Sequence, residues 1–169
     1  MESHDLPLTI ADGEVVLRVL RDPQGFYSRR RKHVGEPFRR GDISPMQLFR
    51  PHRSEHDSSL IRQSIGAGGV ALHAKDVPNA IALVPFTAGD ARAIPYDDRQ
   101  ALDVEDDRSV YLGHANLTLP CISPEEFPEP GRTMSEGLRR KLKSIYDDLF
   151  DRCGDVIPLD RQTPAGEDV

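Results

Sequence analysis

The feature that most constrains the fold is a long amphipathic stretch near the C-terminus, MSEGLRRKLKSIYDDLFDRC at residues 134–153. Its apolar residues recur at spacings of three to four, which places them on one face of an α-helix of about five turns. Thr133 or Ser135 can cap the start of this helix, and Gly154 stands where a C′ glycine often ends one. A helix with one apolar face must pack against another layer, so the chain needs a core that receives it. The residues of that face are Met134, Leu138, Leu142, Ile145, Leu149 and Phe150.

Short apolar runs elsewhere predict the strands of that second layer. LTI and EVVLRVL flank the Asp12-Gly13 pair, which is a strong signal for a β-hairpin. The runs VALHA at 70–74, AIALVPF at 80–86 and SVYLGHANLTLP at 109–120 have the length and composition of three further strands. TAGDARAI predicts a short helix, with Thr87 as its N-cap and Asp90 three positions later. ALDVEDD is interpreted only as an acidic segment.

These elements predict an α+β fold, with a small mixed or antiparallel sheet, a short central helix and a long amphipathic C-terminal helix. The predicted single domain spans residues 8–159, between a flexible N-terminus at 1–7 and a flexible tail at 160–169. Within it, residues 21–63 are rich in Pro and Gly and poor in periodic apolar residues, so we expect a long loop-rich segment.

Length and composition exclude several classes of protein. The chain has 169 residues, which suits one domain. Its net charge of −6 argues against a general nucleic-acid binder, because neutralising phosphates takes a surplus of Lys and Arg. Two cysteines, no signal-like N-terminus and no apolar run of membrane-spanning length predict a soluble, cytoplasmic protein that does not engage a membrane.

Charge is unevenly distributed along the chain. Residues 21–62 hold ten Arg or Lys against five Asp or Glu, whereas residues 75–108 hold eight acidic residues against four basic ones. Arg29, Arg30, Arg31 and Lys32 follow Phe26 and Tyr27, and we expect this basic run to contact a partner. The alternative is a solvated surface, because isolated surface charges usually contribute little.

Motifs for metal, cofactor and nucleophile chemistry are weak. His52 and His56 lie four apart in HRSEH, but the Glu does not follow the first His as it does in zinc proteases, so no metal site is predicted. GAGGVAL lacks the Lys and hydroxyl residue of a phosphate loop, and it precedes an expected strand where nucleotide loops follow one. The sequence therefore predicts no cofactor.

Residues 48–120 resemble short uncharacterised bacterial proteins in the order of their motifs. The matching pieces are LFRPHR, VALHA, FTAGDARAI and GHANLTLP. The resemblance implies a bacterial origin and a compact α+β unit, and it implies no activity. It draws attention to Arg50, Arg92 and His114, the polar residues that fall on the pattern.

Two functions remain open from the sequence. The first is an accessory or regulatory protein that binds a protein partner, supported by the uneven charge and the lack of catalytic motifs. The second is a small enzyme or binding protein for an anionic ligand such as a nucleotide. In that case Arg50, His52 and Arg92 would bind the anion and His114 would act as acid or base. His114 also has a structural interpretation, as an interior group of its strand.

Overall fold

The computed structural model describes residues 6–21, 41, 43–51, 58–129 and 132–159. These residues form one antiparallel six-stranded sheet, in the order β6-β7-β2-β1-β3-β8, and a separate two-stranded ribbon, β4-β5. The strands are β1 (Val15–Arg21), β2 (Ser58–Arg62), β3 (Ala80–Thr87), β4 (Pro95–Tyr96), β5 (Arg99–Gln100), β6 (Asp103–Asp106), β7 (His114–Thr118) and β8 (Ile157–Pro158). The α-helices are α1 (Pro45–Phe49), α2 (Ala67–Lys75), α3 (Ala88–Arg92) and α4 (Glu136–Arg152), with 3₁₀ turns η3 (Gln63–Ile65) and η4 (Pro124–Glu126). The predicted α+β class is confirmed.

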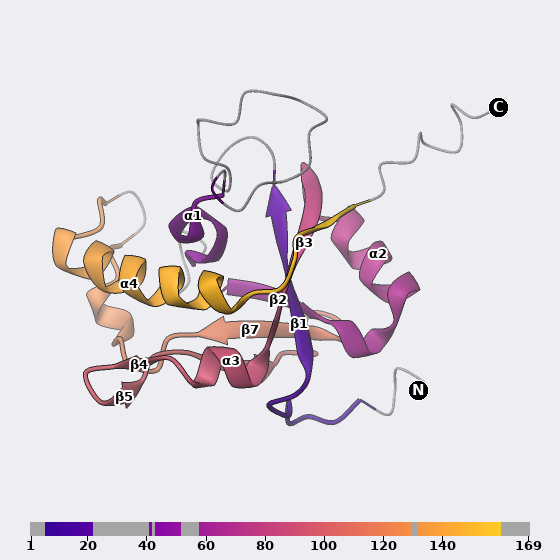
Figure 1. The fold of residues 1–169 in the computed structure, drawn as a ribbon, viewed down its shortest axis with the longest axis horizontal. Helices are drawn as coiled ribbons and strands as arrows, with labels where there is room; N and C mark the ends of the chain where they lie inside the picture. The colour runs from indigo at the N-terminus through magenta and orange to yellow at the C-terminus, as the bar shows by residue number, and fades with distance from the viewer. Residues whose placement is uncertain (1–5, 22–40, 42, 52–57, 130–131, 160–169) are drawn as a thin grey trace.

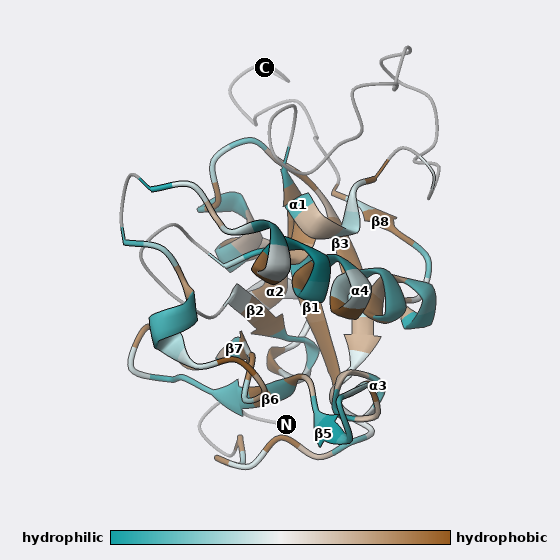
Figure 2. Cartoon of the chain, turned by 90° about the vertical axis from the view of Figure 1, so that its left-hand side faces the viewer, coloured by the Kyte–Doolittle hydropathy of each residue, from teal (hydrophilic) through white to brown (hydrophobic). Residues whose placement is uncertain are grey.

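Helices cover both faces of the sheet. In Figure 1, α1 and α4 lie to the left of β1 and β3, and α2 lies to their right. Successive strand residues point to opposite faces, so Val16 and Leu20 pack toward α1 and α4, whereas Leu17 and Val19 pack toward α2. Because both of its faces are covered, the central strand β1 is hydrophobic and brown in Figure 2, whereas the arrow of the edge strand β6 is hydrophilic and teal.

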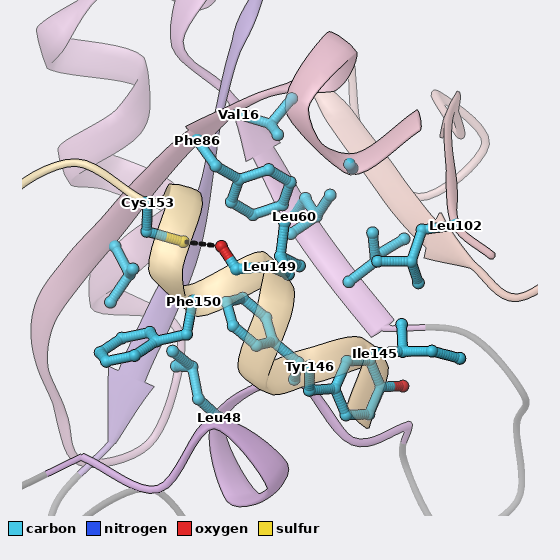
Figure 3. Close-up of a cluster of buried hydrophobic side chains, with 14 of the residues drawn as sticks. Val16, Leu48, Leu60, Phe86, Leu102, Ile145, Tyr146, Leu149, Phe150 and Cys153 are labelled. Atoms are coloured by element: carbon cyan, nitrogen blue, oxygen red, sulfur yellow. Dashed lines mark hydrogen bonds between the residues drawn. The ribbon is translucent and has the colours of Figure 1, made fainter. Parts of the chain in front are cut away.

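The larger core lies between the sheet and α4. Ser135 begins α4 by accepting a hydrogen bond from the Leu138 backbone N–H at 3.2 Å, as predicted. Figure 3 shows Tyr146, Leu149 and Phe150 of α4 together with strand residues of this core. Gly154 differs from the prediction: it does not take a positive φ, and its N–H donates to the Pro85 carbonyl at 2.9 Å. The residue that follows α4 is thus held by a hydrogen bond to β3, and α4 does not end in a left-handed glycine cap.

Three predicted elements are wrong in type or extent. VALHA lies inside helix α2, where Val70 and Ala74 bury one face at helical spacing. Only His114–Thr118 of the predicted strand 109–120 is a strand. The acidic segment contains a strand, β6, because Val104 points into the core while Asp103 and Glu105 face outward.

The predicted hairpin at Asp12-Gly13 is also absent from the structure. A two-residue hairpin turn of that kind needs positive φ angles, and neither residue has one. The carbonyls of this segment instead accept from helix α3: the Gly89 N–H donates to Asp12 O at 2.8 Å, and Ala88 N–H to Glu14 O at 3.0 Å. Strand β1 therefore pairs with β2 and β3, which come later in the chain.

The loop-rich segment and the termini are described only in part. Within residues 21–63 the structure contains helix α1 and strand β2, which the Pro and Gly content did not suggest. The tail 160–169 lies outside the described residues. Of the predicted flexible N-terminus, Leu6 and Pro7 are described; Leu6 is buried, and both carbonyls accept hydrogen bonds from Arg108.

A buried arginine joins the N-terminal segment to strands β2 and β6. Arg62 has a relative exposure of 0% and contacts Glu14 through Nε at 2.6 Å and Nη2 at 2.7 Å. Its Nη1 donates to Asp106 at 2.7 Å and to the Pro7 carbonyl at 2.6 Å. Arg108 adds a second contact to Asp106, at 2.8 Å. Every contact named here is charge-assisted, which makes the network strong once it is complete.

We predict that Arg62→Ala lowers the free energy of unfolding by about 3–5 kcal/mol, because Glu14 loses its cation and Asp106 keeps only Arg108. Urea unfolding followed by circular dichroism measures the change. The matched control is Arg152→Ala, which removes an exposed pair with Asp148 and should cost less than about 1 kcal/mol. Equal losses for the two variants would contradict a structural role of this network.

We also predict a stability loss in acid that depends on Asp106. Burial favours a raised pKa for Asp106, but hydrogen bonds from Arg108 and Arg62 outweigh burial and hold this pKa below its usual value. The contribution of Asp106 is thus complete above the unfolded-state pKa of about 3.9 and is lost as the pH falls through the lower folded-state pKa. Urea unfolding at a series of acid pH values should show a shallower loss for Asp106→Asn than for the wild type. Parallel curves would refute this.

Candidate functional site

His114 begins β7 and faces the α2 side of the sheet. It pairs with Ile61 of β2, whose side chain belongs to the core under α2. Its relative exposure is only 6%. Its Nδ1 lies 3.5 Å from Oδ2 of Asp107. His114, predicted to act as acid or base, thus lies beside a carboxylate, but it is largely covered.

Asp107 is the centre of this cluster. It accepts hydrogen bonds from the Ser109 hydroxyl and from Asn116 Nδ2, the latter at 3.0 Å. The hydrogen bond from Ser109, followed by that from Asn116 and the charge of His114, lowers the pKa of Asp107 below its usual value. In a catalytic triad the histidine stands between the serine and the carboxylate. Here the carboxylate stands between Ser109 and His114, so the arrangement ties the turn 107–113 to β7 and does not activate a nucleophile.

Gly113 brings the same turn close to the chain that enters α2. Its φ is +103°, and a Cβ at this position would collide with Ile65. Its carbonyl accepts from the Arg62 N–H at 2.8 Å. Only glycine fits this position without strain, so the backbone of the turn 107–113 packs closely on the Ile65 side chain of η3.

Tyr111 links His114 to α2. Its ring stacks on His73 with centroids 3.6 Å apart and an interplanar angle of 7°. It also meets His114 edge to face at 5.1 Å. Burial, with a further contribution from the charge of Asp76, raises the pKa of Tyr111 to about 12. Tyr111 is therefore a neutral, half-buried aromatic group that joins helix α2 to the turn 107–113.

Arg92, predicted to bind an anion, is engaged inside the protein. Its Nε contacts Asp103 at 2.8 Å and its Nη1 contacts Asp12 at 2.8 Å. It also donates to the carbonyls of Ile10 at 2.7 Å and Val104 at 2.9 Å. These four contacts use the guanidinium to fasten the N-terminal segment and α3 to the edge strand β6.

The other predicted ligand residues do not converge with Arg92. Arg50 follows α1 and lies near Tyr146, on the α4 side of the sheet, whereas His114 lies on the α2 side. His52 lies outside the described residues. The predicted partner-binding run Arg29, Arg30, Arg31 and Lys32 also lies outside them. Arg50, Arg92 and His114 thus occupy three separate places in the fold.

The outward side of α2 carries the charged Lys75 among small and apolar residues. Gly68, Ala71, Leu72 and Lys75 recur at helical spacing on the side opposite the buried Val70 and Ala74. Leu72 is 61% exposed, and Val110 of the adjoining turn is 60% exposed. Both are neighbours in the chain of the stacked His73–Tyr111 pair. We call Gly68, Ala71, Leu72 and Lys75 the α2 face.

The outward side of α4 provides the comparison. It carries three exposed ion pairs at i, i+4 spacing, and its other outward residues are also polar. This is the usual pattern of a helix that faces water on one side. A short helix that is apolar on its outward side as well is more typical of one that is covered. Of these two helices, α2 is therefore the one whose outward side is more typical of an interface. The three pairs are Glu136–Arg140, Lys143–Asp147 and Asp148–Arg152.

The described residues were also compared with the requirements of a metal-ion site and of a membrane-spanning helix. Within them, no group of three or more His, Cys, Asp or Glu side chains is arranged to hold a metal ion. None of the helices in the described ranges is both long and apolar enough to cross a membrane.

Comparison of the chain with protein-family models, curated proteins and solved structures finds no match. The resemblance of residues 48–120 to short uncharacterised bacterial proteins therefore stays a prediction.

Sequence reasoning missed the α2 face because it placed a strand at VALHA. The signal was present: Val70 and Ala74 are four apart, and Ala71, Leu72, Ala74 and Lys75 favour helices. Assigning a helix to 67–75 would have shown that it lacks a polar side. The role of Asp107 gave no local signal, because its partners lie as far as nine residues along the chain.

We predict that Asp107→Ala lowers the free energy of unfolding by about 1–3 kcal/mol, because the buried His114 and the half-buried Asn116 lose their carboxylate partner. Urea unfolding measures the loss, and amide exchange should become faster within 107–113. Asp151→Ala, an exposed position on α4, is the control and should change stability by less than about 0.5 kcal/mol. An unchanged turn in Asp107→Ala would show that Asp107 does not hold it.

Proposed function

We propose that the protein acts by protein–protein interaction, as a bacterial accessory or regulatory protein, and that the α2 face is its binding surface. The observation that carries this proposal is the exposed Leu72 on the outward side of α2, together with the exposed Val110 of the turn whose Tyr111 stacks on α2. Exposed apolar residues that cluster on one element usually mark a binding surface.

The arginines near the sheet edge also support this proposal, because their guanidinium groups already have partners inside the protein. Arg62, Arg92 and Arg108 contact carboxylates or carbonyls inside the protein. Arg50 and His114 lie on opposite sides of the sheet. Among the described residues, Arg50, Arg92 and His114 do not converge, which favours the interaction surface over the anionic-ligand alternative.

The His73–Tyr111 stack supplies an aromatic border to the α2 face. Tyrosine combines a large apolar ring with a polar hydroxyl, and it is enriched at protein interfaces. Because Tyr111 is also in contact with His114, the border is held by the rigid cluster around Asp107. A preorganised surface loses less side-chain freedom when a partner binds.

We predict that Leu72→Glu abolishes binding of the partner while leaving the fold intact. The test is affinity purification from the organism that encodes the protein, followed by mass spectrometry. The control is Ser144→Glu, which puts the same charge on the exposed side of α4. The wild type and Ser144→Glu should retain one stoichiometric partner that Leu72→Glu loses.

A further variant separates the α2 face from the basic run. Replacing Arg29, Arg30, Arg31 and Lys32 together with Ala should leave the partner bound if the α2 face is the main surface. Loss of the partner in this variant, with retention in Leu72→Glu, would assign binding to the basic run and overturn the proposed surface.

A further inference from the structure

The outward residues of α2 match a second copy of themselves. We propose that the α2 face packs antiparallel against the α2 face of another copy, forming a two-fold symmetric dimer. This inference rests on the proposed function, since it names the partner of the same surface.

The first argument is the fit of side-chain sizes. If the two-fold axis passes between Ala71 and Leu72, Leu72 of each copy lies against Ala71 of the other, and Lys75 lies against Gly68. Large residues then meet small ones at every position of the face, which is how helices interdigitate. A side chain at Gly68 would meet no atom within 4 Å in the single chain, so that space is open. The long Lys75 stem can cross it with its charge in water.

The second argument is electrostatic. The N-terminus of α2 follows Gly66 and has no side-chain cap, so the N–H groups of its first turn have no side-chain acceptor. Asp76 is exposed at the other end of the helix, ten residues from Gly66 and about 15 Å away along the axis. In the antiparallel arrangement Asp76 of one copy comes beside the N-terminus of the other. A carboxylate is stabilised there by the helix dipole and by the N–H groups.

The third argument is the symmetry of the charges. A two-fold interface brings each residue near the axis close to its own copy. The residues near this axis, Ala71 and Leu72, are uncharged, and the charged Lys75 and Asp76 lie at the ends of the face. Nothing near the axis repels its own copy, and the two helix dipoles oppose each other favourably.

The decisive experiment is analytical ultracentrifugation of the full chain from about 1 µM to about 1 mM, where modest interfaces associate. The wild type should pass from monomer to dimer over this range. Leu72→Glu and Leu72→Lys should each stay monomeric, because each places like charges at the axis. An equimolar mixture of the two should dimerise again, since Glu and Lys then face each other. Ser144→Glu should dimerise like the wild type.

The outcomes separate the dimer from the proposed function. A wild type that stays monomeric at every concentration overturns the dimer, and the proposed function is then judged by the affinity purification alone. A dimer that persists in Leu72→Glu, or a mixture that fails to dimerise, shows that the copies meet elsewhere and also overturns it. Circular dichroism of each variant confirms that the fold is retained at the exposed position 72. Asp76→Asn should weaken dimerisation about three- to thirtyfold, because the symmetric dimer contains two such charges, each at a helix N-terminus.

Discussion

The buried guanidinium of Arg62 holds together parts of the chain that are far apart in sequence. It joins Glu14 before β1, Asp106 at the end of β6 and the carbonyl of Pro7, while its own backbone N–H bonds to Gly113. The edge strand β6 carries two outward acids and would otherwise be held by one neighbour, β7. Because the turn 107–113 follows β6, the position of Tyr111 beside α2 depends on this network.

Arg92 connects the N-terminal segment to the other end of β6 in the same way. It links Asp12 and the Ile10 carbonyl to Asp103 and Val104. The contact with the Val104 carbonyl also occupies a backbone acceptor on the sheet edge, which limits pairing with another strand. Asp103 and Asp106 of the acidic stretch are therefore held by Arg92, Arg62 and Arg108. Arg92, which the sequence predicted to bind an anion, thus stabilises the fold.

Elements with a local or periodic signal could be predicted from the sequence. The apolar spacing of α4, its Ser135 cap and the Thr87 cap of α3 are all confirmed. Elements whose conformation depends on contacts between distant parts of the chain could not. Asp12-Gly13 does not form a hairpin because α3 donates to the carbonyls of Asp12 and Glu14. ALDVEDD contains a strand because Val104 enters the core, while Arg92 and Arg62 pair with Asp103 and Asp106. The apolar α2 face was hidden by an incorrect strand assignment.

The proposed dimer through the α2 face can be located on the chain without any substitution. Amide hydrogen exchange, read at low and high protein concentration, tests it most directly because it maps any contact onto the chain. The account predicts slower exchange at high concentration in residues 67–75 and 107–113, with α4 unchanged. Slowing confined to α4, or no change anywhere in the described residues, would contradict it.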